Sequence, residues 1–372
     1  MSLRVGVEPR ARPALAVRLG VPIASLAAAG LVGAVVIGIS GASPLDAYQT
    51  MLDSSLKGWR PLTRTLVLAS PLILTGLAAA VAFRMKVWNI GAEGQLYMGA
   101  IAAAGGAVAL PAGTPKVFML GVILSAGALA GALWAGLAAL PKAYFNTNEV
   151  ITTLMLNFVA LYFMNYLIFG SVSFWRDREA TFPQGKIIPD AAQLPIISHR
   201  LHYGLLIALA AALVLWWSLR GTTWGFELRT IGDSPAASRY AGMSVSGKIL
   251  SVLALSGALA GLAGAIEVSG VLKTLDPRAI ATELGFTGIV VAAVARLNPL
   301  GVVPVAVLLG AVVASGTNLQ TIGIEAEIVF LLQGLIFLFV ASGEFFLSNR
   351  LVLSSAPAPH MAAAEASMND RP

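Results

Sequence analysis

Ten apolar runs divide this 372-residue chain and constrain its fold more than any other feature. The first run covers residues 19–39, and 21 residues in a helix extend about 31 Å, which is enough to cross the core of a lipid bilayer. The other nine runs are 65–83, 96–110, 117–140, 150–168, 201–219, 249–268, 286–295, 302–319 and 328–347. None alternates with a period of two, so they predict helices rather than a membrane barrel.

The composition agrees with a chain that lies mostly within a lipid bilayer. Hydrophobic residues make up 57% of it and charged residues 11%, whereas about a quarter of a soluble domain is charged. We therefore predict an all-α integral membrane protein with about ten transmembrane helices. The 38 glycines would let such helices approach closely, and Gly127 and Gly131 have the GxxxG spacing of a helix contact. Without cysteine, disulfides and thiolate metal sites are excluded.

The distribution of charge predicts the orientation. Ten crossings that start from a basic N-terminus place both termini in the cytoplasm, because cytoplasmic segments carry an excess of Lys and Arg. The predicted cytoplasmic segments then hold 14 basic and 8 acidic residues, and the external ones hold ten of each. The predicted parts are a cytoplasmic N-terminus (1–18), a transmembrane domain (19–347) with an external loop (170–200) and a cytoplasmic loop (220–248), and a disordered C-terminal tail (348–372).

The cytoplasmic loop contains the signals of a short helix. Ser234 can cap a helix that starts at Pro235, since proline suits the first helical position, and Gly242 can end it in a left-handed conformation. This predicts a short element outside the bilayer between Asp233 and Gly242. Two interpretations stay open from the local sequence: an ordinary interfacial connector, or a surface on which another protein acts.

Two further polar breaks interrupt the apolar pattern. Residues 88–95 are either a tight cytoplasmic turn or a broken helix that faces a transport pathway, because irregular backbone at membrane depth needs protein or water around it. The short run 286–295 ends at Arg296 and is followed by Pro299, which predicts a half helix or an irregular one.

Polar side chains in or beside the spans are costly in lipid and are the candidates for a solute pathway. The candidates are Asn89, Glu93, Gln95, Asn148, Asn157 and Glu267. Amides also hold membrane helices together, and Glu93 has an alternative role as the partner of Arg84 or Lys86.

No catalytic or metal-binding pattern is found. The pair His199 and His202 lacks a carboxylate or cysteine at ligand spacing, and the spans contain no HExxH or GxSxG motif. Residues 242–248 match GxxxxGK, but Ile249 stands where an ATP site needs Ser or Thr. The net charge of +6 needs no nucleic acid to explain it.

The loop resembles the coupling segment of membrane permease subunits of ATP-binding-cassette (ABC) importers, whose short helix with an Ala-Ala pair and a following glycine docks on the ATPase. The residues that the resemblance assigns to coupling are Arg229, Gly232, Asp233, Pro235, Ala236, Ala237, Tyr240 and Gly242.

Four more stretches are similar to the nucleoside and simple-sugar branch of the branched-chain amino acid and sugar permease family. They are NIGAEGQ at 89–95, EVITTLMLN at 149–157, GFTGI at 285–289 and NPLG at 298–301. The resemblance covers residues 62–344, so the long external loop lies inside that range but outside the motifs.

The resemblance implies a multi-pass permease subunit of the bacterial inner (plasma) membrane that forms a pathway for nucleosides or related simple sugars and is not itself an enzyme. Its implied partners are a cytosolic ABC ATPase, a second and related permease chain, an external solute-binding protein and membrane lipid, with no nucleic acid. The chain would bind no cofactor, since ATP and Mg would belong to the ATPase. The alternative is an ion-gradient-driven secondary transporter that acts alone, which broken helices would also suit.

Overall fold

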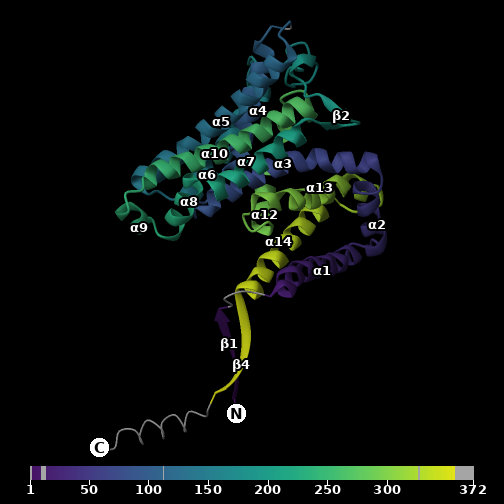
Figure 1. Ribbon diagram of the computed structural model, residues 1–372. Coiled ribbons are helices and arrows are strands. Elements are labelled where there is room, and N and C mark those ends of the chain that lie inside the picture. The colour runs from purple at the N-terminus through teal and green to yellow at the C-terminus, as the bar shows by residue number, and fades with distance from the viewer. Residues whose placement is uncertain (1, 10–13, 112, 326, 357–372) are drawn as a thin grey trace, which may run out of the picture. The chain divides into compact units, whose positions relative to one another are not determined.

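Each of the ten apolar runs forms a helix in the computed structural model, which describes residues 2–9, 14–111, 113–325 and 327–356 (Figure 1). These helices are α1 (Leu15–Ile39), α3 (Trp59–Arg84), α4 (Ala92–Ala109), α5 (Lys116–Phe145), α6 (Glu149–Asn165), α7 (Gly204–Gly221), α10 (Val245–Ile266), α12 (Leu284–Val294), α13 (Pro299–Thr321) and α14 (Glu327–Ser348). Nine helical segments of the described chain are long and apolar enough to cross a membrane. The expected helix missing from that set is α4, which carries Glu93 and Gln95 in its first turn.

Several shorter elements were not predicted. They are α2 (Pro44–Ser55), α8 (Thr223–Asp233), α11 (Pro277–Ile280), the π-helical turns η1 (Tyr166–Gly170) and η3 (Glu267–Leu272), the 3-10 turn η2 (Asp190–Ala192), and the hairpin of β2 (Ile196–Ser198) with β3 (Leu201–His202). The helix predicted from residue 201 therefore starts late, because Leu201 and His202 pair with β2 and α7 begins at Gly204.

The chain divides into two compact units. The terminal unit comprises Met1–Pro44 and Phe330–Pro372. In it, β1 (Ser2–Pro9) pairs antiparallel with β4 (Asn349–Ala356), and α14 approaches α1 so closely at Gly343 that a Cβ there would overlap the Ser25 hydroxyl. The strand β4 stands where the sequence predicted a disordered tail, and residues 357–372 lie outside the described residues.

The second unit, which we call the helical body, comprises Leu45–Val329 and is organised around α3. Residues 69–83 of this helix are buried without a break, and α10, α12 and α13 all pack against it. A helix that is apolar on every side is stable where other helices surround it. The side chain of Ser70, also buried, donates to the Leu66 carbonyl of its own helix.

Glycines let α10 contact α4 and α5 through the backbone. A Cβ at Gly131 would overlap the carbonyl of Gly257, and one at Gly127 would come 2.6 Å from the Cβ of Ala265. From α4, a Cβ at Gly99 would overlap the carbonyl of Gly261, which also contacts Gly127 of α5. The close contact predicted from the GxxxG spacing is confirmed, and its partner is the glycine row of α10.

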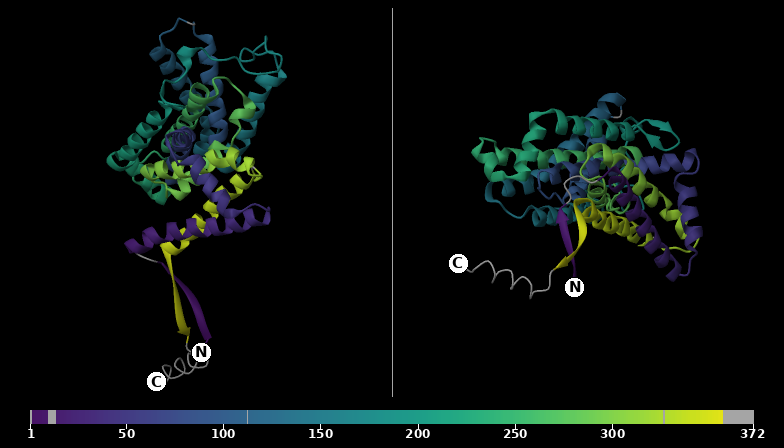
Figure 2. Two further views of the ribbon diagram at one scale, coloured as in Figure 1. Left: turned by 90° about the vertical axis from the view of Figure 1, so that its right-hand side faces the viewer. Right: turned by 60° about the horizontal axis from the view of Figure 1, so that its bottom comes forward.

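The predicted external loop (170–200) and the predicted cytoplasmic loop (220–248) lie at opposite ends of α10 (Figures 1 and 2). At the C-terminal end, the predicted external loop folds onto η3: the Ile188 N–H donates to the Lys273 carbonyl at 2.9 Å, and the Leu194 N–H donates to that of Ser269 at 2.9 Å. At the N-terminal end, α8 and the short helix α9 (Pro235–Tyr240) precede α10. This arrangement suits the predicted placement of the two segments on opposite sides of the membrane, which stays a prediction.

The glycine contact predicts a large difference between two substitutions in α5. Gly131→Val should lower the free energy of unfolding by about 2 kcal/mol or more, since a side chain there must push α10 away. Gly136→Val is the matched control, because a Cβ at Gly136 meets no atom within 4 Å. Thermal unfolding of the two variants in lipid nanodiscs measures the effect, and equal melting temperatures would contradict the proposed packing.

The burial of the His202 imidazole predicts that stability depends on pH. Its side chain is 1% exposed, its Nδ1 accepts from the Gly204 N–H at 3.1 Å, and burial lowers its pKa to about 4 from 6.5. Because the unfolded chain takes up this proton first, stability should fall as the pH drops from 6.5 towards 4, by about 2 kcal/mol at pH 5. The loss should be absent in His202→Gln. Chemical unfolding curves at pH 7 and pH 5 for both proteins test this, and parallel losses would rule His202 out.

Candidate functional site

The segment between α7 and α10 forms two helices rather than one. The Thr222 Oγ1 accepts from the Gly225 N–H at 3.3 Å and caps α8, which the sequence reading missed. Leu228 and Ile231 of α8 are buried, three residues apart on one face. This spacing, with the Thr222 cap ahead of it, is the pattern from which α8 could have been predicted.

The short helix α9 starts and stops as predicted. The Ser234 Oγ accepts from the Ala237 N–H at 3.3 Å, Pro235 occupies the first helical position, and Gly242 has φ +81°. After the helix, the Met243 N–H returns to the Ser238 carbonyl at 2.9 Å. The helix is therefore confirmed, with the bounds Pro235–Tyr240 inside the predicted range.

Most of α9 is open to the outside of the helical body. Pro235, Ala236 and Ala237 are exposed, Tyr240 is 97% exposed, and Ser238 is the buried residue of this helix. Asp233, Arg229 and Gly242, on either side of the helix, are exposed too. Of the eight predicted coupling residues, seven are thus exposed, and Gly232 is buried.

Gly232 is the point at which α8 meets the core. A Cβ at this position would lie 2.9 Å from the Arg84 carbonyl and 3.2 Å from the Cα of Met85, so only glycine allows α8 to rest on the end of α3. Nearby, Lys86 Nζ lies 3.5 Å from the Asp233 carboxylate in an exposed ion pair. The Arg229 side chain donates to the Leu219 carbonyl at the end of α7.

The residues between α3 and α4 form a connection that is buried except at Lys86, Trp88 and Ile90. The break at 88–95 is therefore a link between two helices followed by the first turn of α4, and all of its residues except Trp88 and Ile90 are buried. Whether it is a cytoplasmic turn or faces the pathway stays a prediction. Asn89, which is 0% exposed, exchanges two hydrogen bonds of 3.0 Å with the Gln95 side chain and donates to Ser256 Oγ of α10 at 2.8 Å. Ser256 in turn donates to the Ala78 carbonyl of α3 at 2.7 Å.

Asn157 ties α6 to the same connection. Its Oδ1 accepts from the Gly94 N–H at 2.8 Å, and its Nδ2 donates to the Ile90 carbonyl at 2.8 Å. Gly94 lies in the first turn of α4, where backbone N–H groups have no partner within the helix. Asn157 therefore caps α4 from a neighbouring helix.

Glu93 does the same for α12. Its Oε2 accepts from the Gly285 N–H at 2.5 Å, and its Oε1 accepts from the Tyr97 hydroxyl at 2.7 Å. A carboxylate is favoured at the start of a helix, where the N–H groups are free and the helix dipole is positive. The alternative partners Arg84 and Lys86 are wrong: neither forms an ion pair with Glu93 among the described residues, and Lys86 pairs instead with Asp233.

The remaining candidates are not part of this cluster. Asn148 is exposed and caps its own helix, α6, by accepting from the Val150 N–H at 3.0 Å. Glu267 is buried in η3, and its Oε1 has no hydrogen-bond partner among the described residues. Sequence reasoning missed Glu149, which pairs with Lys142 at 2.8 Å and accepts from the Trp88 N–H at 3.3 Å.

These features define a class: a multi-pass helical membrane protein with a buried polar cluster and an exposed helix at one end of its long helices. The family model for the permease component of branched-chain amino acid transport systems matches residues 62–341. The chain belongs to this family and is a permease subunit of an ABC importer in the inner membrane.

Three relatives resemble the chain over most of its length. The guanosine ABC transporter permease protein NupP of Bacillus subtilis is 36% identical over 87% of this chain and 92% of its own. The glucose ABC transporter permease protein TsgB13 of Haloferax volcanii is 34% identical over 94% of each. The nucleoside ABC transporter permease protein NupB of Lactococcus lactis is 30% identical over 86% of this chain and 90% of its own. No solved structure matches.

The cap that Asn157 provides predicts a large loss of stability on its removal. Asn157→Ala leaves the buried Gly94 N–H and Ile90 carbonyl without partners, which should cost about 2 kcal/mol or more. The control is Asn165→Ala on the same helix, because Asn165 donates only to the Leu161 carbonyl one turn away. Thermal unfolding in nanodiscs compares the two variants. If Asn165→Ala is destabilised as much as Asn157→Ala, the cap adds no more stability than a hydrogen bond within one helix.

Proposed function

We propose that this permease carries nucleosides or related simple sugars and that α9 is the surface on which a cytosolic ABC ATPase docks. The observation that carries the docking proposal is the exposed α9 surface joined to Gly232, which rests on the end of α3. The proposal for the solute is supported by the guanosine and nucleoside permeases among the relatives, with the glucose permease extending it to sugars.

The surface of α9 suits a close helix-on-protein contact. Ala236 and Ala237 have small side chains, so a partner can approach the backbone, and the exposed Tyr240 offers an aromatic anchor of the kind common at interfaces. A displacement of α9 by the ATPase would pass through α8 to Arg84 and Met85. From there the buried connection leads to Asn89 and the polar cluster.

The proposed assembly contains other chains. The ATPase would bind ATP and Mg, and this chain would hold no cofactor. A second permease of related but different sequence fits the relatives, since Bacillus subtilis has a second guanosine permease protein, NupQ, that is 26% identical to this chain. An external binding protein would deliver the solute, and both termini would face the cytoplasm.

The pathway roles of Asn89, Glu93, Gln95, Asn148, Asn157 and Glu267 stay predictions. Asn89, Glu93, Gln95 and Asn157 have hydrogen-bond partners within the protein, so direct contact with a solute would require exchange of those bonds. Glu267 fits such a contact best, because its Oε1 is buried without a partner among the described residues.

Two substitutions at Gly242 test the docking helix. Its φ of +81° is costly for a β-branched residue, whereas asparagine adopts this region readily, and a Cβ would meet no atom within 4 Å. Gly242→Val should therefore distort the end of α9 and reduce solute-stimulated ATPase activity of the reconstituted complex several-fold. Gly242→Asn should keep it near the wild-type rate.

Binding of the external receptor to both variants is the control and should be unchanged. Full stimulation in Gly242→Val would contradict the assignment of α9 as the docking element. An equal loss in both variants would instead point to the bulk of the side chain rather than the shape of the helix end.

A further inference from the structure

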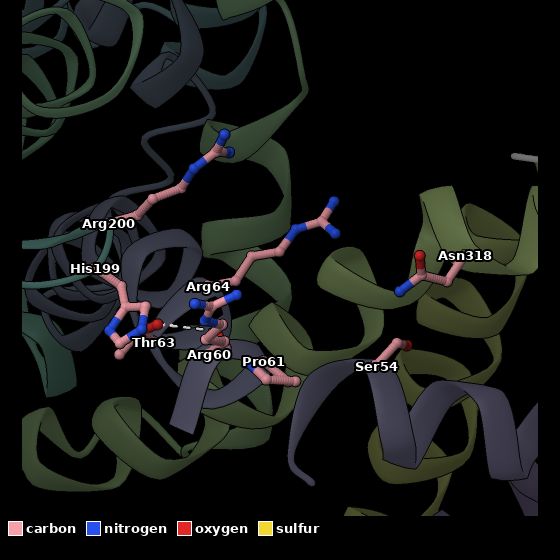
Figure 3. Close-up of a pocket in the computed structure, with 8 residues that line it drawn as sticks. All are labelled: Ser54, Arg60, Pro61, Thr63, Arg64, His199, Arg200 and Asn318. Carbon is pink, nitrogen blue, oxygen red and sulfur yellow. Dashed lines mark hydrogen bonds between the residues drawn. The ribbon is translucent and has the colours of Figure 1, made fainter. Parts of the chain in front are cut away.

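Two adjoining cavities in the helical body are lined by cationic side chains. The first has a volume of about 550 Å³ and is lined by Arg60, Arg64 and Arg200 among others (Figure 3). The second, of about 470 Å³, shares Arg64 and Arg200 and adds Lys273. Because they share two arginines, the two hollows form one site, which we call the basic cavity.

Three separate segments bring these charges together. Arg60 and Arg64 belong to the first two turns of α3, Arg200 lies in the turn between β2 and β3, and Lys273 follows η3. The backbone is left-handed at Lys273, with φ +61°. In Figure 3 the Arg64 and Arg200 side chains come from different segments and extend in the same direction. The arrangement is therefore tertiary and not a run of basic residues along the sequence.

Among the described residues, no acidic side chain lines either hollow. Asp46 and Asp53 line an adjoining hollow that shares Ser54 and Asn318 with the first, and Asp53 lies 3.1 Å from Lys57 in an ion pair. Arg64 donates to the Thr317 hydroxyl at 2.8 Å, a neutral partner that holds the guanidinium without cancelling its charge. A cleft lined by one sign of charge attracts the opposite ion.

The chemistry of the lining indicates which anion. Guanidinium groups bind the oxygens of phosphate and carboxylate in pairs, and the start of α3 adds the positive end of a helix dipole. Four positive charges suit a phosphate monoester, which carries about −1.5 to −2 at neutral pH, better than a single carboxylate. We propose that the basic cavity is a binding site for a phosphate-bearing anion, separate from the site for the uncharged solute.

Phosphate can reach the cavity from two sources. One is a small phosphorylated molecule in solution, for which the volume lies within the range of about 300–1,000 Å³ usual for ligand pockets. The other is the headgroup of an anionic lipid, since the cavity lies at the end of a membrane-spanning helix. The shared chemistry is the phosphate group, and the experiment separates the sources.

The test measures binding of inorganic phosphate and of ribose 5-phosphate to the full chain in phosphatidylcholine nanodiscs, with ribose as the uncharged comparison. The cavity variant is Arg60→Gln with Arg200→Gln, because neither side chain donates a hydrogen bond to another described residue. The control is Lys116→Gln with Arg178→Gln, which removes the same charge from positions that line neither hollow. A charge-preserving variant, Arg60→Lys with Arg200→Lys, covers the case in which the Gln variant fails to fold.

Wild type and control should bind both phosphates, and the cavity variant should bind them on the order of tenfold more weakly, as expected for loss of a charged hydrogen bond. The Lys variant should bind with intermediate affinity. If phosphatidylglycerol in the nanodisc competes with free phosphate in wild type, the lipid is the natural occupant and the site stands. Equal phosphate binding in the cavity variant and wild type, or no binding of phosphate or phosphatidylglycerol by wild type, would overturn the proposal.

Discussion

Helices that begin inside a membrane protein need partners for the backbone N–H groups of their first turn, and this requirement shapes the centre of the molecule. Water is scarce there, so side chains of neighbouring helices do the capping. Asn157 of α6 caps α4, and Glu93 of α4 caps α12. Each cap therefore fixes the position of one helix relative to another, and the order of α6, α4 and α12 follows from two side chains.

The same buried residues lie next to the surface proposed for docking. Gly232 of α8 rests on Arg84 and Met85, and four residues later Asn89 bonds to Gln95 and to Ser256 of α10. The exposed helix α9 and the capped first turns of α4 and α12 are thus separated by one short connection. A mechanism in which a partner acts on α9 would reach α3, α4 and α10 together.

A feature could be predicted from the sequence when the residues that cause it lie close together along the chain. The apolar runs and the Ser234, Pro235 and Gly242 signals act within a few residues, and the helices they predict are present. The partner of Glu93 is an N–H 192 residues away, so the sequence suggested nearby Lys86 instead. The helix α8 was missed because its apolar face is short and lies in a segment that is polar on average. The meeting of Arg64 and Arg200 could not be foreseen either, since it depends on how the hairpin folds back.

The glycine contacts of α10 have a consequence for motion. Where Gly131 meets Gly257 and Gly99 meets Gly261, backbone touches backbone, and no layer of side chains is present that could change rotamer and let one helix slide past another. The trio α4, α5 and α10 should therefore behave as one rigid block. Any alternation of access must then use joints outside this block.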